Sequence, residues 1–249
     1  MVSGKYSALA GAISREQRLA NISANLANVN TVGYKKTRMS FESLLRGEKQ
    51  TQEAKGINYS RVRENFTEFT EGPIKETANP LDLAIHGEGF FKVSSPDGDR
   101  YTRRGDLQVD RNGQLQTKNN MAILDDGNQP ITIPDIDTSK ISVNNLGEVS
   151  VLSLEGTRNV VGRIGVYTIN DNNLLKRESD TLFSLEEGGQ EIPVEEPRLA
   201  SASLEISNVN MTEEMALMID TLRTFETYQK VLKSYGALGQ KQDELGTLG

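Results

Sequence analysis

The chain has 249 residues, of which 36% are hydrophobic, and a formal net charge of −7. This length allows one large domain or two modest ones, and the apolar content can bury a core in only part of the chain. The absence of cysteine excludes disulfides and thiolate metal sites. No stretch approaches the ~18 apolar residues of a membrane span, and the first residues lack the basic region and apolar run of a signal peptide. We therefore expect a soluble protein, or one that leaves the cytoplasm without a cleaved signal peptide.

Positive charge is concentrated towards the N-terminus. Residues 1–46 contain seven Lys or Arg and two Asp or Glu, a net charge of +5, which leaves −12 for the rest of the chain. The basic residues are not interleaved with aromatic side chains, as they are in many surfaces that bind nucleic acid. The asymmetry favours head-to-tail assembly, and we expect no nucleic-acid partner.

The N-terminal residues predict a helix. Between Ser3 and Asn28 there is no proline, and apolar side chains recur at helical spacing. The helix should end near Asn28, because the following Asn-Val-Asn-Thr-Val-Gly sequence favours turns and Gly33 can adopt the left-handed conformation.

A longer helix is predicted at the C-terminal end. Asn210-Met-Thr-Glu213 is typical of a helix start, with a side-chain acceptor at the cap and a carboxylate three residues later. Apolar or aromatic residues then recur three and four apart as far as Leu245, with a slip around Tyr228. This spacing favours a coiled-coil-like seam with a partner helix.

The two predicted helices can pair with each other or with other copies of the chain. Packing of each helix on its own domain is the simpler interpretation, but a compact centre does not readily supply a partner for both ends. We therefore predict an assembly interface formed by Leu9, Ile13, Leu19, Ile22, Leu26, Met215, Met218, Leu222, Phe225, Val231 and Leu238.

The predicted fold class is α+β, with an antiparallel β domain between the terminal helices. Short alternating runs such as Gly89-Phe-Phe-Lys-Val and Glu148-Val-Ser-Val-Leu are separated by turn pairs such as Asn112-Gly113. Residues between Arg46 and Pro80 fit neither a clean helix nor a clean strand. The expected boundaries are 1–45 for the N-terminal helical part, 46–80 for an extended connector, 81–207 for the β domain and 208–249 for the C-terminal helix.

The centre contains no pattern typical of catalysis or cofactor binding. Gly87-Glu-Gly-Phe-Phe enters a strand-like run and lacks the ending of a phosphate loop. His86 is the only histidine, so no His-His metal pair exists, and the acidic turns near Asp110 and Asp125 lack the spaced carboxylates of a calcium loop. We expect a tight turn, a structural histidine and hairpin turns, with no catalytic residue, metal, cofactor or small-molecule substrate.

Two adjacent arginines follow an aromatic residue in Tyr101-Thr-Arg-Arg-Gly105. Such a group can form an anion site or an interface. A solvated strand is the interpretation that we favour for this segment.

The stretch Asn21-Ile-Ser-Ala-Asn25-Leu-Ala-Asn28-Val-Asn-Thr31-Val-Gly33-Tyr34-Lys35 resembles the N-terminal signature of flagellar rod, hook and hook-associated axial proteins. The resemblance continues in order through 81–91, 101–105, 110–115 and 207–215. Its motif positions are Asn25, Asn28, Thr31, Gly33 and Tyr34. Two departures occur, since Ala24-Asn25 replaces the usual Asn-Asn pair and Gly33-Tyr34 replaces the usual Gly-Phe.

The resemblance implies a structural subunit of the flagellar basal-body rod. It implies a terminal helical domain made from both chain ends, an extended arm and a β domain on the outside of a tubular filament. The implied partners are copies of the chain, neighbouring rod subunits and the flagellar type III export apparatus. The implied location is the rod, which spans the periplasm.

Within this family, the length leaves the FlgF-type proximal-rod and FlgG-type distal-rod proteins. The segment from Arg46 to Tyr59 is short and lacks a Gly-x-Gly-Val element associated with the distal type, which favours the FlgF type. The alternatives are the FlgG type and, from another class, a secreted binding module trimerised by its helices. An enzyme would need convergent acid-base groups, which the sequence does not contain.

Overall fold

The computed structural model describes residues 2–46, 57–134, 141–153 and 157–246, and side chains within 4–40, 65–134, 141–153 and 157–241. The described helices are α1 (Val2–Ala27), α2 (Met211–Gly246) and the 3₁₀ turn η2 (Asn172–Leu174). The described strands are β1 (Thr37–Arg46), β2 (Ile57–Thr67), β3 (Ile74–Glu76), β4 (Leu83–Ile85), β5 (Phe90–Ser95), β6 (Gly98–Thr102), β7 (Leu107–Val109), β8 (Leu115–Thr117), β9 (Ala122–Ile123), β10 (Ile141–Val143), β11 (Glu148–Leu152), β12 (Arg158–Arg163), β13 (Val166–Ile169), β14 (Leu175–Arg177), β15 (Leu182–Leu185), β16 (Glu191–Pro193), β17 (Leu199–Ser201) and β18 (Ser203–Glu205).

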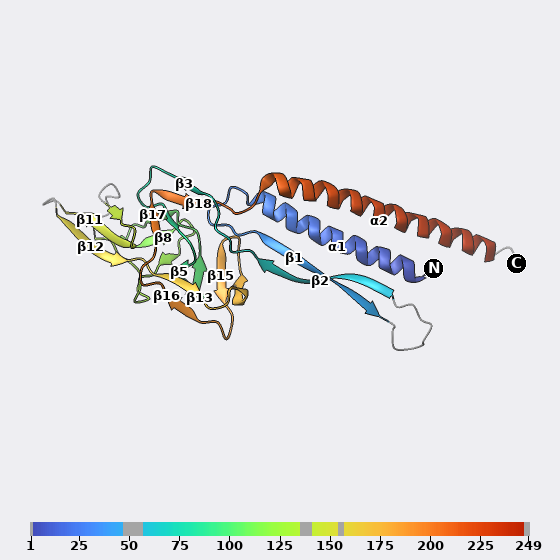
Figure 1. Cartoon of the computed structure of the whole chain (residues 1–249), viewed down its shortest axis with the longest axis horizontal. Coiled ribbons are helices and arrows are strands. Elements are labelled where there is room, and N and C mark those ends of the chain that lie inside the picture. The colour runs from blue at the N-terminus through green and yellow to red at the C-terminus, as the bar shows by residue number, and fades with distance from the viewer. Residues whose placement is uncertain (1, 47–56, 135–140, 154–156, 247–249) are drawn as a thin grey trace. The chain divides into compact units, whose positions relative to one another are not determined.

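The chain forms two compact units (Figure 1). The helical unit contains Met1–Ala27, Thr37–Phe66 and Asn210–Gly249, and the β unit contains Asn28–Lys36 and Thr67–Val209. The mixed α+β class, with antiparallel sheets between terminal helices, is confirmed. None of the described helices has a stretch apolar and long enough to cross a lipid bilayer.

The ends of both helices follow from local chemistry. After α1, Thr31 donates its backbone N–H to the Asn28 carbonyl (3.1 Å), and Gly33 has a φ of +70°. At the start of α2, the Asn210 side chain accepts hydrogen bonds from the N–H groups of Thr212 (3.0 Å) and Glu213 (3.3 Å). Both the predicted turn and the predicted cap are therefore confirmed.

The connector prediction was wrong about local structure. Strand β2 lies inside the expected connector and pairs with β1 as a two-stranded sheet within the helical unit. Strand β1 begins inside the range assigned to the N-terminal helical part and ends at the first residue of the connector. Residues 47–56 lie outside the described part of the chain. These strands were missed although Met39-Ser-Phe41 and Ile57-Asn-Tyr59 alternate apolar and polar residues, because each alternation is brief and polar residues surround it.

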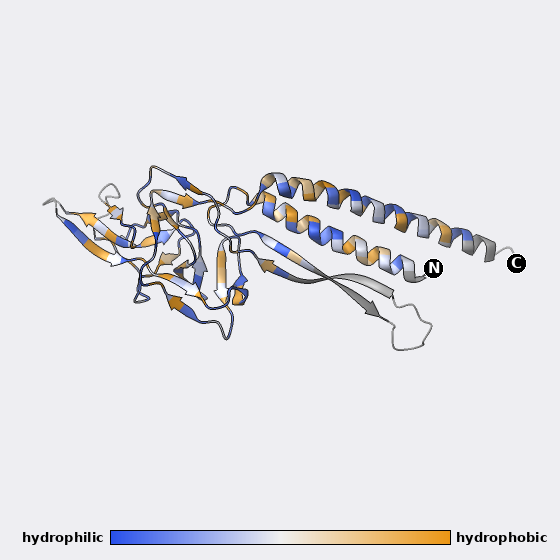
Figure 2. Cartoon of the chain, in the orientation of Figure 1, coloured by the Kyte–Doolittle hydropathy of each residue, from blue (hydrophilic) through white to orange (hydrophobic). Residues whose placement is uncertain are grey.

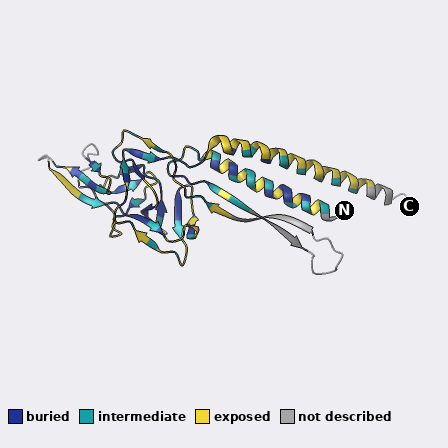
Figure 3. Cartoon of the chain, in the orientation of Figure 1, coloured by how far each residue is buried: buried dark blue, intermediate teal, exposed yellow. Residues whose placement is uncertain are grey.

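The β unit is built on antiparallel pairing. Its largest sheet has the strand order β14-β15-β6-β5-β9-β8-β7, with β13 joined to β5 and β16 joined to β13. A second sheet has the order β10-β11-β12, and short pairs β17-β4 and β18-β3 connect the beginning and the end of the unit. Buried and less buried positions alternate along β11, whereas the first four residues of β5 are all buried. Figures 2 and 3 show the hydropathy and the burial of both sheets.

Most of the predicted hairpins are present, with some displaced boundaries. Gly113 and Gly147 have φ angles of +80° and +85° in their turns, whereas near Gly127 the positive φ falls on Asn128. The segment Ile131-Thr-Ile133, which has the alternation of a strand, makes only isolated bridges among the described residues, although Ile131 and Ile133 are buried in the main core. The core itself contains side chains from both sheets, including the fully buried Phe91.

A buried ion cluster, Lys35–Glu205–Arg103, ties the segment after α1 to the β unit. The Lys35 Nζ donates to Glu205 Oε1 (2.5 Å) and to the Thr70 carbonyl (2.7 Å), while Arg103 Nη1 donates to Glu205 Oε2 (3.2 Å). The Gly33 N–H also donates to the Glu205 carbonyl (2.8 Å). Burial lowers the pKa of Lys35 below its usual range, although the Glu205 carboxylate opposes this shift.

The cluster explains why Asn28–Lys36 belongs to the β unit and not to the helical unit, to which α1 and β1 on either side of it belong. Asn208 completes the attachment, because its side chain accepts from the Lys36 N–H (2.6 Å) and donates to the Glu68 carbonyl (2.8 Å). Arg177 lies over the Tyr34 ring (4.8 Å) and donates to the Lys35 carbonyl. The residues just after α1 and just before α2 are thus held in one hydrogen-bonded cluster.

We predict that Glu205→Ala destabilises the protein by about 3–5 kcal/mol, because two buried cations lose their shared carboxylate. Urea unfolding followed by circular dichroism measures this change. The control is Glu178→Ala, which breaks the half-exposed pair with Arg100 (2.5 Å) and should cost less than about 1 kcal/mol. Equal costs for the two variants would contradict a stabilising role for the cluster.

Candidate assembly interface

The two terminal helices pack against each other in antiparallel orientation. A Cβ atom built on Gly4 would lie 2.5 Å from the Tyr235 hydroxyl, and one on Gly11 would lie 2.6 Å from the Tyr228 ring. At the other end of the pair, Asn25 Nδ2 donates to Glu214 Oε2 (3.4 Å). Residue numbers therefore decrease along α2 in the direction in which they increase along α1. These three contacts fix the register of the pair.

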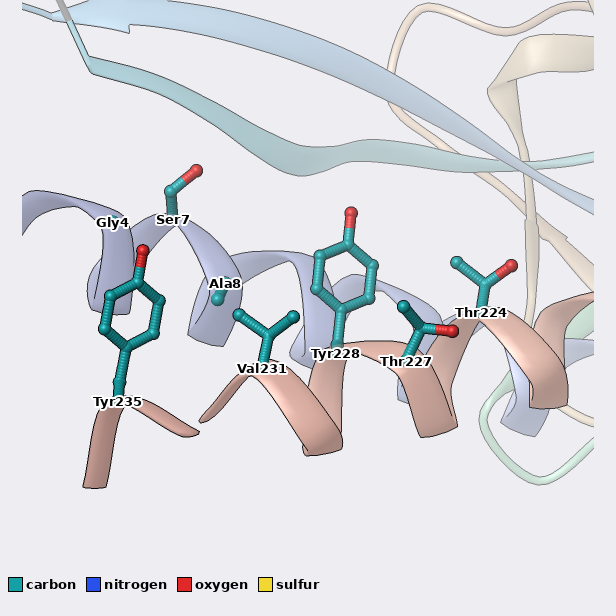
Figure 4. Close-up of a pocket in the computed structure, with 8 residues that line it drawn as sticks. All are labelled: Gly4, Ser7, Ala8, Thr224, Thr227, Tyr228, Val231 and Tyr235. Carbon is teal, nitrogen blue, oxygen red and sulfur yellow. The ribbon is translucent and has the colours of Figure 1, made fainter. Parts of the chain in front are cut away.

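Small residues on α1 receive the two tyrosines of α2. Figure 4 shows Tyr228 and Tyr235 rising from α2 towards α1 beside Gly4, Ser7 and Ala8. These residues, with Thr224, Thr227 and Val231, line a groove of about 480 Å³ along the pair. Since glycine has no side chain, the helix backbones approach closely while the rings fill the space between them.

Asn25 joins three elements of the helical unit. Its side-chain oxygen accepts from the Thr37 N–H (3.1 Å) and its amide donates to the Thr37 carbonyl (3.0 Å), at the first residue of β1. The same amide contacts Glu214 of α2, and both Asn25 and Glu214 are 1% exposed. A side chain with both a donor and an acceptor is needed for these contacts.

Each helix also presents apolar side chains on the face turned away from its partner. We call these the α1 outer stripe (Tyr6, Leu9 and Ile13) and the α2 outer stripe (Met211, Met215, Ile219 and Leu222), all of which are exposed. At 100° per residue, the four α2 side chains fall within an arc of about 80°, and the three α1 side chains within about 60°. Figure 3 shows exposed positions along the length of α2. Both stripes form surfaces that this chain leaves uncovered.

Three family sequence models match the chain. The model described as "Flagella basal body rod protein" matches residues 6–35, "Flagellar hook protein FlgE/F/G D1 domain" matches 84–151, and "Flagellar basal body rod FlgEFG protein C-terminal" matches 200–243. The chain is 31% identical to the flagellar basal-body rod protein FlgG of Bacillus subtilis, over 93% of this chain and 94% of the relative. It is 30% identical to the rod protein FlgF of Caulobacter vibrioides, over 96% of each.

The chain belongs to the flagellar basal-body rod protein family. It is a structural subunit of the rod, as the resemblance of its motifs implied. A third relative, FlgG of Buchnera aphidicola subsp. Acyrthosiphon pisum, is 34% identical over 90% of this chain and 92% of the relative.

The predicted interface residues of the rod protein divide into three classes. Ile22 is buried within the helical unit, and the half-buried side chains flank the seam between α1 and α2. The half-buried residues are Leu19, Leu26, Met218 and Phe225. The exposed residues are Leu9, Ile13, Met215, Leu222, Val231 and Leu238. The exposed class presents the most surface to another molecule.

The motif residues of the rod protein are divided between the units. Asn25 lies in the helical unit, whereas Asn28, Thr31, Gly33 and Tyr34 lie in the β unit. Thr31 Oγ1 donates to Asn28 Oδ1 (2.9 Å), and Tyr34 is buried. A Cβ on Gly33 would lie 2.5 Å from the Arg104 nitrogen, so both its positive φ and its surroundings require glycine.

Several important residues were not among the predicted site residues. Gly4 and Gly11 are seven residues apart, and so are Tyr228 and Tyr235, a matched spacing that could have indicated close helix packing. Nothing in the sequence pattern distinguished Glu205 from the other carboxylates, since its partners are distant in the chain.

The arginine pair was interpreted incorrectly. Arg103 is buried in the ion cluster rather than solvated, and Arg104 Nε pairs with Asp106 Oδ1 (2.6 Å). The sequence pattern did not reveal that burial because the balancing carboxylate of Arg103 is 102 residues away.

Polar groups in the β unit have internal structural partners. Asp110 Oδ1 accepts from the N–H groups of Asn112 (2.8 Å) and Gln114 (2.7 Å), as in a hairpin turn. Burial, with a hydrogen bond to Glu191, raises the pKa of Tyr101. Within the described residues, no three His, Cys, Asp or Glu side chains gather as a metal site.

We predict opposite effects for two glycine substitutions in the helical unit. Gly236→Ala should stabilise the protein by up to about 1 kcal/mol, because Gly236 lies in α2 with no atom within 4 Å of its added Cβ. Gly11→Ala should be destabilising, because the gain in helix propensity is outweighed by the clash with Tyr228.

Thermal unfolding followed by circular dichroism compares the two variants. In a Tyr228→Ala background the clash is absent. Adding Gly11→Ala to that variant should therefore stabilise it relative to Tyr228→Ala alone, through the gain in helix propensity. Stabilisation by Gly11→Ala in the unsubstituted background would show that the helices do not pack through this contact.

Proposed function

We propose that the rod protein assembles into the axial drive shaft through its terminal helices. The observation that carries the proposal is the exposure of apolar side chains on both α1 and α2 after the two helices have packed on each other. Complete burial of a Leu or Met side chain contributes roughly 1.5–3 kcal/mol. Several such side chains per subunit can therefore offset the entropy lost when subunits associate.

The seam between α1 and α2 supports a coiled-coil-like pairing. Side chains towards α1 recur at Glu214, Thr221, Tyr228 and Tyr235, which are seven residues apart, and each is buried or half-buried. A seven-residue repeat is typical of helices that supercoil around each other. In this proposal, the pair acts as one rod-like element that neighbouring subunits contact.

Within the family, we propose a FlgF-type subunit of the proximal rod. The relatives include both FlgG and FlgF proteins at similar identity, so overall similarity does not separate the two types. The short segment between Arg46 and Tyr59, without a Gly-x-Gly-Val element, supports the FlgF type. A distal FlgG-type subunit is the alternative.

The other expected properties follow from the same proposal. Export by the flagellar type III apparatus would proceed without cleavage of the N-terminal region. That region would then form α1 in the rod, which spans the periplasm. No enzymatic role is proposed, because the titratable side chains of the β unit are used in structural contacts such as the Lys35–Glu205 pair. A secreted binding module trimerised by its helices is the rival from another class.

We predict that Leu222→Asp prevents incorporation into the rod while leaving the chain folded. Leu222 is 42% exposed, so the carboxylate remains solvated in the free chain but would be buried without a partner in the assembly. Immunoblots of isolated hook–basal bodies measure incorporation, and circular dichroism measures folding. The control is Val160→Asp on β12, which is 63% exposed in the β unit.

Gold-labelled antibody on the same hook–basal bodies distinguishes the two types of subunit. Label towards the inner membrane supports the FlgF type, and label near the outer-membrane rings supports the FlgG type. Normal incorporation of the Leu222→Asp variant would contradict assembly through the helices. Recovery of the unsubstituted protein only as free oligomers or at the cell surface would favour the binding module.

A further inference from the structure

The two outer stripes lie at different heights along the helical pair. The contacts of Gly11 with Tyr228 and of Asn25 with Glu214 place the α1 outer stripe beside the segment 226–233 of α2. The α2 outer stripe spans Met211 to Leu222 and lies nearer the other end of the pair. Their centres are about 13 residues apart in this register, which corresponds to roughly 20 Å along the helix axis at 1.5 Å per residue.

The two stripes cannot cover each other within one chain. The seam side of each helix is occupied by the other helix, through Gly4 and Gly11 on α1 and Tyr228 and Tyr235 on α2. The stripes occupy other faces, and all seven of their side chains remain exposed. Contact between an α1 outer stripe and an α2 outer stripe therefore requires two copies.

Net charge favours contact between α1 of one copy and α2 of another over α1–α1 or α2–α2 contact. Three basic residues and one acidic residue occur in α1, giving a net charge of +2. Four basic and six acidic residues occur in α2, giving −2. An α1–α1 or α2–α2 contact brings like net charges together, whereas an α1–α2 contact brings opposite charges together.

We propose that the α1 outer stripe of one copy docks on the α2 outer stripe of the next copy, with an axial shift of roughly 20 Å between them. This inference rests on the proposed assembly through the helices and specifies which surfaces meet. The contact is heterologous, because the two surfaces differ, so it propagates from copy to copy instead of closing as a dimer. Repetition of this contact from copy to copy builds a filament.

The absence of cysteine makes disulfide cross-linking a direct test. Ile13→Cys and Met215→Cys place one thiol on each stripe, and the two positions lie too far apart within one chain for the ~4.4–6.8 Å Cα separation of a disulfide. Hook–basal bodies are isolated from cells that produce the doubly substituted chain, oxidised with copper phenanthroline and analysed by non-reducing electrophoresis. The pair Leu9→Cys with Ile219→Cys tests the same antiparallel contact at a second position.

The expected result is a ladder of dimers, trimers and higher species from a doubly substituted chain. Each single variant should give monomer alone. The matched control combines Ile13→Cys with Ala216→Cys, which is exposed one residue further along α2 and off the stripe, and should give no ladder. Dimers from Ile13→Cys alone would show a contact between like helices and overturn the proposal. Incorporation of both doubly substituted chains without a ladder would also overturn it, while leaving assembly through the helices intact. Absence of the unsubstituted chain from rods would overturn both.

Discussion

The packing of α1 on α2 is the interaction on which the rest of the structure depends. It joins segments from the two ends of the chain through contacts such as Gly11 with Tyr228, and it fixes their antiparallel register. The same contact determines which apolar side chains are covered and which remain exposed. A change in register would bury part of an outer stripe and expose part of the seam, so the surface available for assembly is a consequence of this pairing.

A second non-local constraint lies in the β unit. The ion cluster links residues 170 positions apart, Lys35 and Glu205, immediately beyond the end of α1 and before the start of α2. Closing a loop of this length costs conformational entropy, which the contacts of the cluster help to offset. Together with the pairs β18-β3 and β17-β4, the cluster brings the two chain segments that lead to the helices into one folded unit. Residues of the family motif thus serve the β unit as well as the helices.

Sequence patterns were sufficient where structure is local. The cap at Asn210, the turn at Gly33 and hairpin glycines such as Gly113 follow from the conformations of single residues, and they were predicted correctly. The ribbon β1-β2 was missed because its apolar alternation is brief, as in Ile57-Asn-Tyr59, and lies among polar residues. Arg103 was misassigned as solvated because its partner Glu205 is distant in the sequence.

For the candidate interface, sequence patterns indicate possible residues but not which face of each helix is covered. Helical spacing identified apolar positions on both terminal helices, but it could not say which face would be covered by the other helix. That distinction depends on Gly4 and Gly11, whose role is to lack a side chain where Tyr235 and Tyr228 approach. An apolar pattern indicates which side chains favour burial, whereas the glycines indicate where two helix backbones approach closely.

Oxidation of methionine by dilute peroxide, measured by mass spectrometry, distinguishes an exposed outer stripe from one covered in the rod. Met211 and Met215 lie on the α2 outer stripe, and Met121, partly buried against the core of the β unit, serves as the reference. Peroxide converts accessible methionine to its sulfoxide. If the stripe is buried on assembly, Met211 and Met215 will oxidise readily in the free chain and much more slowly in isolated rods, while Met121 changes little. Equal oxidation rates for Met211 and Met215 in the free and assembled protein would contradict assembly through this surface.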